Sequence, residues 1–144
     1  MDGYAFEDLQ VGQSASVGKT ITEADILLFS AVTTDTNPVH LNAEVAAQSV
    51  FKERVAHGML SAGLISAVLG TQLPGPGTVY LGQTLKFRAP VRIGDTVTAT
   101  AEVTALDTAR RRATLRTVCT VDGKPVIEGE ATVLVPARSV SAVG

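Results

Sequence analysis

The stretch His57-Gly58-Met59-Leu60-Ser61-Ala62-Gly63-Leu64-Ile65-Ser66-Ala67-Val68-Leu69-Gly70 decides the fold of this chain. Its residues are apolar or small on almost every helical face, and a helix without a polar face is typically buried. At about 14 residues it is too short to cross a bilayer, which needs roughly 20. Its glycines disfavour a helix, so they indicate close packing against a sheet or close approach by a ligand. We therefore expect a central core helix.

Beyond this helix the chain is predicted to form strands. The breaker Leu73-Pro74-Gly75-Pro76-Gly77 ends the helix, and Val, Thr and Leu are frequent in the segments that follow. The expected strands are 78–88, 95–106, 113–121 and 125–135, with one more before the helix at 14–20. Strands of about ten residues predict a long, curved antiparallel sheet joined by hairpins, with Asp122-Gly123 as the clearest turn. The predicted fold class is α+β, a sheet wrapped around one helix.

Composition bounds the class of protein. The 144 residues fit one domain, 1–136, followed by a loose tail at 137–144. Apolar residues make up 45% and charged residues 18%, which is typical of a globular chain. The net charge of -2, with no Trp, argues against a nucleic-acid partner. We expect Arg110-Arg111-Arg112 to be an exposed hairpin turn, with an anion contact as the alternative.

The lone cysteine and the start of the chain point to the reducing interior of a cell. The lone Cys119 lies in an alternating run and is expected to be a packed core thiol. Two histidines and one cysteine show no metal-ligand spacing, so no metal is expected. The polar, acidic start of the chain has no signal-peptide pattern, and no membrane association is expected. We therefore predict a cytoplasmic protein.

Two short helices are predicted between the first strand and the core helix. Thr22 can cap the first of them, with Asp25 completing a variant capping box, and this helix should end near Thr33. A second, alanine-rich helix should run through Ala47. The segment between these helices carries the most reactive side chains of the chain.

A carboxylate and an imidazole lie five residues apart in the segment Asp35-Thr36-Asn37-Pro38-Val39-His40. Pro38 disfavours a helical Asn37 but suits a first helical position, so Asn37 is the expected N-cap. His40 then falls in the first turn, where the helix dipole favours a neutral ring that can accept a proton. Asp35 can turn back toward the same space, which makes the two residues a candidate catalytic pair. The alternative is a plain turn with Asp35 as a cap and His40 on the surface.

A third candidate is Gly58, at the expected amino end of the core helix. Main-chain N–H groups at this end have no helical partner and can bind an oxyanion. The alternative reading is a simple turn before a core helix.

Four segments in order resemble one known family: Asp35-Thr36-Asn37-Pro38-Val39-His40, Ala46-Ala47, His57-Gly58-Met59 and Tyr80-Leu81-Gly82-Gln83. Together they are similar to the MaoC-like, hydratase 2 family of R-specific enoyl-CoA hydratases, and most similar to its short single-domain members. Those members supply R-3-hydroxyacyl-CoA for polyhydroxyalkanoate synthesis. The resemblance extends from about Phe6 to Val135.

The resemblance implies a hot-dog fold with an added overhang, and a homodimer formed through the sheets. By position, Asp35 and His40 match the catalytic pair, and Asn37 matches a supporting polar residue. Gly58 matches the main-chain donor to the thioester oxygen, and Ser66 matches a site serine of the short members. Tight helix packing is the alternative role for Ser66. The substrate would be an acyl-CoA, and no cofactor is implied.

Hydration of an α,β-unsaturated thioester needs a base, an acid and a donor to the enolate oxygen. His40 could activate the water and Asp35 could protonate C2 in a syn addition, although the reverse assignment stays open. Two other functions also remain: an acyl-CoA thioesterase and a non-catalytic acyl-CoA-binding subunit. The candidate partners of the CoA phosphates are Arg54, Lys86, Arg88 and Arg92.

Overall fold

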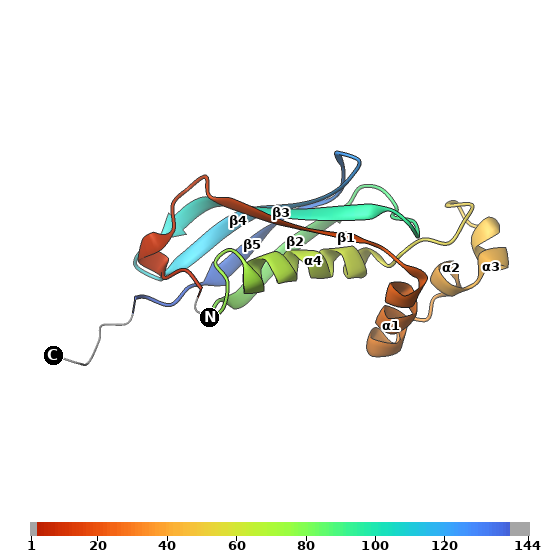
Figure 1. Ribbon diagram of the computed structural model, residues 1–144, viewed down its shortest axis with the longest axis horizontal. Coiled ribbons are helices and arrows are strands. Elements are labelled where there is room, and N and C mark those ends of the chain that lie inside the picture. Colours follow the sequence, from red (N-terminus) through yellow and green to blue (C-terminus); the bar gives the residue numbers. More distant parts are fainter. Residues whose placement is uncertain (1–2, 139–144) are drawn as a thin grey trace.

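The computed structural model describes residues 3–138, and the description below concerns these residues. Figure 1 shows a sheet lying along one long helix, with three short helices beyond one end of that helix. The elements are η1 (Phe6–Asp8), β1 (Ser14–Thr20), α1 (Glu23–Thr33), α2 (Pro38–Leu41), α3 (Ala43–Ala47), α4 (Gly58–Thr71), β2 (Val79–Phe87), β3 (Thr96–Asp107), β4 (Arg112–Val121) and β5 (Lys124–Leu134). The expected strands are therefore confirmed to within a few residues, and α4 is the expected central helix.

The five strands form one antiparallel sheet in the order β1-β3-β4-β5-β2. Hairpins join β3 to β4 and β4 to β5, and Asp122 and Gly123 turn the second of them with positive φ. The expectation that hairpins join all of the later strands is wrong at one place. Strand β2 pairs with β5, while β3 pairs with β1, so the connection between β2 and β3 crosses the sheet. Alternation along a strand indicates which face is buried but carries no information on its neighbour.

Helix α4 packs against all five strands, which wrap it as in a hot-dog fold. Its buried side chains belong to one helical face: Ser61, Ala62, Ile65, Val68 and Leu69. The prediction of burial on every side is wrong for the single chain, because another face is exposed. That exposed stripe consists of Met59, Gly63, Ser66 and Gly70, at the spacing of one helical face.

The short helices α1, α2 and α3 form an overhang at the amino end of α4 (Figure 1). The capping box is confirmed: the Thr22 hydroxyl accepts from the Asp25 N–H, and the Asp25 carboxylate accepts from the Thr22 N–H. An ion pair of 2.8 Å between Arg54 and Glu23 ties α1 to the loop after α3. The overhang is therefore held to the chain that leads into α4.

Three further predictions concern isolated groups. Cys119 is fully buried, and burial raises the pKa of its thiol to about 11, so it is the expected core thiol. Arg110 and Arg111 lie in the β3–β4 turn, as expected, while Arg112 begins β4. Most of the expected tail, residues 139–144, lies outside the described residues. Arg138, which was assigned to that tail, contacts Glu7 and Asp8 near the start of the chain.

Candidate active site

Asp35 is placed by the turn between α1 and α2. Thr34 ends α1 in a left-handed conformation with φ of 64°, which a β-branched residue rarely adopts. The Asp35 carboxylate then accepts a hydrogen bond of 3.3 Å from the Asn37 N–H. Asn37 caps α2 as predicted, its side-chain oxygen accepting from the Val39 N–H at 3.2 Å, with Pro38 at the first helical position. The side chain of Asp35 is exposed in the single chain.

His40 has one ring nitrogen bonded to the protein and one without a hydrogen-bond partner among residues 3–138. Its Nδ1 lies 2.7 Å from the main-chain oxygen of Val55. A carbonyl oxygen only accepts, so Nδ1 carries the hydrogen, and in the neutral ring Nε2 carries the lone pair. Helix α2 has only 4 residues, so its dipole contributes little to this state. The contact with Val55, and not the helix dipole, leaves Nε2 available as a base.

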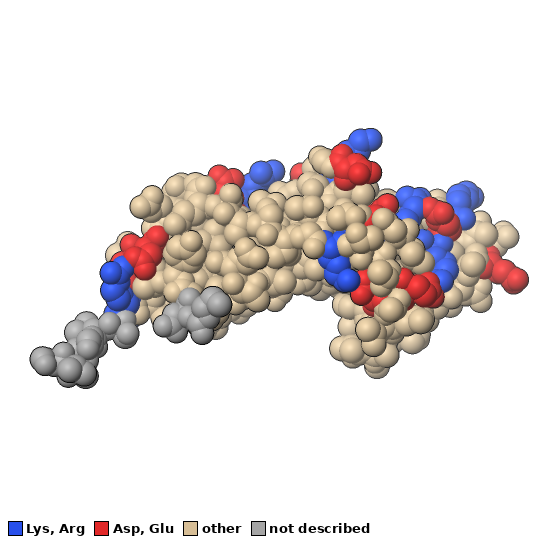
Figure 2. All heavy atoms as spheres, in the orientation of Figure 1, with Lys and Arg blue, Asp and Glu red and all other residues tan. Residues whose placement is uncertain are grey.

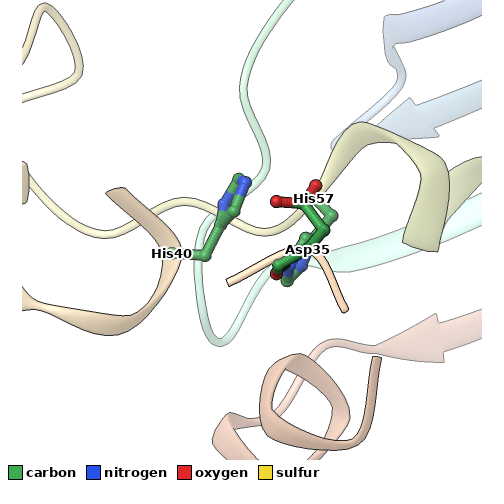
Figure 3. Close-up of side chains that lie close together, drawn as sticks. All are labelled: Asp35, His40 and His57. Carbon is green, nitrogen blue, oxygen red and sulfur yellow. Dashed lines mark hydrogen bonds between the residues drawn. The ribbon is translucent and has the colours of Figure 1, made fainter. Parts of the chain in front are cut away.

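The predicted pair is brought together, and His57 joins it. One carboxylate oxygen of Asp35 and one nitrogen each of His40 and His57 all lie within 4.8 Å of one another. Figure 3 shows the three side chains converging from the α1–α2 turn, α2 and the start of α4. His57 was expected only as part of the His57-Gly58-Met59 motif, and no role was predicted for it. Two features of the sequence pointed to it: His57 is one of only two histidines in the chain, and it directly precedes the candidate Gly58.

These three residues have the donor types of a metal site, but their geometry does not favour one. The imidazole rings of His40 and His57 are stacked, with centroids 3.8 Å apart and planes inclined by 26°. The lone pair of an imidazole nitrogen lies in its ring plane, so stacked rings direct their lone pairs along separate planes and not toward one ion. The arrangement suits proton transfer better than metal binding.

Two adjoining cavities share His40, Gly58 and Phe87. The smaller has a volume of about 200 Å³ and is also lined by Asp35, His57 and Met59. The larger, of about 420 Å³, runs toward the core and is lined mainly by apolar side chains. Asn37 lines this larger cavity. His40 therefore lies where a reactive, polar space meets an apolar one.

Gly58 begins α4 at the boundary of both cavities. Among the described residues, no hydrogen-bond acceptor is found for its N–H, which is therefore free to bind an oxyanion. A Cβ at this position would lie 2.5 Å and 2.6 Å from two ring carbons of Phe87. The glycine thus satisfies a close approach to the sheet, as its presence in the sequence predicted.

Ser66 is not brought to this site within the single chain. It lies about 12 Å farther along α4 than Gly58, at a rise of about 1.5 Å per residue, on the exposed stripe. It lines neither of the two cavities that contain His40. Its assigned role as a site serine stays a prediction.

The segment Tyr80-Leu81-Gly82-Gln83 anchors the edge strand β2. The side-chain nitrogen of Gln83 donates to the buried Thr117 hydroxyl of β4 at 2.9 Å, and the Tyr80 hydroxyl donates to the Gln83 side-chain oxygen. Burial raises the pKa of that Tyr80 hydroxyl. These contacts are structural, because they join strands and do not reach Asp35 or His40.

Three of the four cationic candidates for CoA phosphates are paired with carboxylates: Arg54 with Glu23, Arg88 with Glu128 and Arg92 with Glu53. Within residues 3–138, no ion pair is found for Lys86. Figure 2 shows cationic and anionic side chains interleaved over the overhang end, whereas the middle of this face carries few charges. A phosphate at these arginines would therefore have to compete with a carboxylate.

Known proteins resemble this chain in sequence and in fold. The model of the MaoC-like domain matches residues 8–127. The chain belongs to the MaoC-like family. It is 65% identical to an (R)-specific enoyl-CoA hydratase of Rhodospirillum rubrum, with 94% of each chain covered. It is 53% identical to a 3-hydroxybutyryl-CoA dehydratase of Methylorubrum extorquens, over 92% of this chain and 85% of the relative.

A solved structure of the family has the same fold. The R-hydratase PhaJ1 from Pseudomonas aeruginosa, in its unliganded form, is 44% identical and superposes with a TM-score of 0.89. The match covers 99% of this chain and 94% of that one. The MaoC-like fold therefore extends over nearly the whole chain, the overhang with Asp35 and His40 included.

Proposed function

We propose that this chain is an enoyl-CoA hydratase, which adds water reversibly to a trans-2-enoyl-CoA to give an (R)-3-hydroxyacyl-CoA. The observation that carries the proposal is the convergence of the Asp35 carboxylate and the His40 ring beside the free N–H of Gly58. The similarity to an (R)-specific hydratase and to a 3-hydroxybutyryl-CoA dehydratase supports both the reaction and a short acyl group.

Each group has a distinct part in the reaction. The lone pair on Nε2 of His40 would take a proton from water while the water oxygen attacks C3. The N–H of Gly58 would stabilise the negative charge that develops on the thioester oxygen. A proton would then pass from the carboxyl group of Asp35 to C2. The proton on His40 would return to Asp35 through a bridging water, since a ring nitrogen of His40 and a carboxylate oxygen of Asp35 lie within 4.8 Å, and this restores the starting state.

This placement predicts the stereochemical course. Asp35 and His40 both border the smaller cavity, so the hydroxyl and the proton would reach the same face of the double bond. Addition would therefore be syn, and the similarity to an (R)-specific hydratase supports the R configuration at C3. Hydration of crotonyl-CoA in D₂O, with the configuration at C2 assigned, tests syn addition, and an anti product would contradict it. Chiral analysis of the 3-hydroxybutyryl-CoA tests the configuration at C3, and an S product would contradict the R assignment.

Crotonyl-CoA is the decisive substrate for the reaction itself. Loss of enoyl-thioester absorbance without release of free thiol would support hydration, whereas free thiol would show hydrolysis and an unchanged substrate would show binding alone. Proton-transfer groups contribute about 10²- to 10⁴-fold, so Asp35→Asn and His40→Gln should each lower kcat/KM by at least about a hundredfold. Near-parental kcat/KM in both variants would refute the assignment.

The exposed stripe of α4 supports a second part of the proposal, that the chain works as a homodimer. The edge strand β2, whose one neighbour among the described strands is β5, also exposes apolar side chains: Val79, Tyr80, Leu81 and Phe87. An unpaired edge next to an apolar face is suited to pairing with a second copy of the chain.

Oligomeric state in solution tests this part separately. Gly63 has open space around it, so Gly63→Arg should fold in the single chain and break the dimer. The matched control is Val50→Arg, because Val50 is 87% exposed and lies in the loop after α3. Light scattering should give a dimer for the parent and for Val50→Arg, and a monomer for Gly63→Arg; a monomeric parent would refute the dimer.

No helix among residues 3–138 is long and apolar enough to span a membrane. A cytoplasmic location, and the supply of (R)-3-hydroxyacyl-CoA to polyhydroxyalkanoate synthesis or to fatty-acid metabolism, belong to the proposal. We also propose that the reaction needs no cofactor, since the groups named above account for every proton moved.

A further inference from the structure

His57 is the most deeply buried ionisable side chain beside the proposed site. It is 2% exposed, and its partner Ser30 on α1 is 4% exposed. Its Nε2 lies 3.0 Å from the main-chain oxygen of Asp35 and 3.0 Å from the Ser30 hydroxyl oxygen. Because a carbonyl oxygen only accepts, Nε2 must carry a hydrogen, and the Ser30 oxygen can share it as a second acceptor.

The other nitrogen of His57 indicates which form of the ring fits this environment. Its Nδ1 is buried without a hydrogen-bond partner among the described residues. A second N–H at that position would be an unsatisfied buried donor on a cation, with the His40 ring stacked at 3.8 Å. His57 is therefore a neutral ring with its hydrogen on Nε2, whereas His40 has its hydrogen on Nδ1.

The ring of His57 contacts each part of the proposed site. Its N–H holds the main-chain carbonyl of Asp35, directly after the strained left-handed Thr34. Its face packs on the ring of His40, and the ring of Phe29 lies 4.7 Å away. Its own backbone is the N-cap of α4, so the next residue is Gly58.

We propose that His57 is a positioning residue of the hydration site: it fixes the Asp35 turn by an N–H···O bond and the ring plane of His40 by stacking. Strained turns persist only where surrounding contacts hold them. Without His57, the Asp35 carboxylate and His40 Nε2 lose their common support. This inference rests on the proposed function for its kinetic consequence, but not for the hydrogen positions that it predicts.

Nitrogen NMR tests the hydrogen positions without any substrate. The chain has only 2 histidines, so ¹⁵N-histidine labelling gives two rings, and His57→Phe assigns them by removing one. At neutral pH we expect two neutral rings of opposite tautomer, with the hydrogen of His57 on Nε2 and that of His40 on Nδ1. Two rings of the same tautomer, or a doubly protonated His57, would overturn the proposal.

Two substitutions separate the two contacts kinetically. His57→Phe keeps a stacking ring but has no donor, and His57→Gln keeps an amide donor but has no ring. We expect His57→Phe to lower kcat on crotonyl-CoA by about tenfold or more, the size of one lost hydrogen bond to a group left unpaired. We expect His57→Gln to lower kcat through the lost stacking on His40, and KM should stay within about twofold of the parent in both variants. Parental kcat in both variants, or a loss confined to KM, would overturn the positioning role.

Ser30→Ala is a matched control, because it alters the same buried contact and keeps the ring of His57, and urea unfolding of all three variants shows whether each is folded. It removes only the second acceptor of Nε2, so the ring of His57 and its bond to Asp35 remain. We expect kcat to fall by no more than about threefold, because a shared hydrogen bond contributes less than a full one. A larger loss with an unchanged tautomer would place the function on Ser30 and refute the role of His57. If the parent does not hydrate crotonyl-CoA, the proposed function fails, and the tautomers alone then decide on His57.

Discussion

The contact between Gly58 and Phe87 permits a quantitative test of how α4 meets the sheet at the site. Gly58→Ala adds one methyl group, whose carbon would lie 2.5 Å and 2.6 Å from two ring carbons of Phe87. Carbon atoms in contact are normally separated by about 3.5 Å or more, so the ring has to retreat by about 1 Å. Alanine keeps the main-chain N–H, and the proposed oxyanion donor therefore survives the substitution.

The cost follows from the mobility of the ring. Forcing an extra methyl group into a packed position costs about 1–3 kcal/mol. Phe87 is 54% exposed in the single chain, so its ring is not locked in the core and can turn away from Gly58, and we expect a loss of about 1–2 kcal/mol in the free energy of unfolding. With Phe87→Ala already present, the clash is gone, and alanine should stabilise the helix by up to about 1 kcal/mol relative to glycine.

The sign of the Gly58→Ala effect should therefore reverse between the two backgrounds. Urea unfolding of the parent, both single variants and the double variant, at one protomer concentration, measures this directly. We expect an interaction energy of about 2 kcal/mol, within the range for residues in contact. The same cost of Gly58→Ala in both backgrounds would refute the reasoning, because the loss would then arise from the backbone of Gly58 and not from Phe87.

Four other predictions concern the scaffold. Gly129→Ala should destabilise the protein by about 3 kcal/mol or more, measured by urea unfolding, because its Cβ would lie 1.8 Å from the Thr84 main-chain oxygen; a neutral effect would contradict the β2–β5 pairing. The Cys119 thiol should react with a disulfide reagent at pH 8 only after unfolding, since its pKa of about 11 and its burial both oppose the thiolate; fast reaction in the native state would count against it. Thr22→Ala should cost about 1 kcal/mol at pH 7. The main-chain N–H of Thr22, and Lys19 less strongly, lower the pKa of Asp25, so the carboxylate stabilises the fold above about pH 4 and loses this effect as pH falls through the lowered pKa. An Asp25→Ala penalty that grew in acid would oppose that sign.

Local chemistry made the element boundaries predictable. Thr22 and Asp25 form their capping box, and Asn37 caps α2, because each depends only on groups two or three residues away. Strand β1 also has the expected bounds. The resemblance to the MaoC-like family added the closed arrangement of sheet and helix, which no local pattern contains.

The candidate site was predictable only in part. The convergence of Asp35 and His40 was expected from their spacing across a turn. Their hydrogen-bond partners were not predictable, because Val55 lies 15 residues from His40, and His57 lies 22 residues from Asp35. Ser66, placed at the site by resemblance alone, lies on the exposed stripe of the single chain instead.

By itself, the amino-acid sequence determined where helices and strands begin and end, which residues carry the reactive groups, and that α4 lies against a sheet. Only the tertiary structure decided that β2 lies beside β5, that one face of α4 stays exposed, and which nitrogen of each imidazole carries its hydrogen. Helical and strand periods report which side of an element is apolar. The acceptor that a ring nitrogen meets depends on where distant segments pack, and no period along the chain records that position.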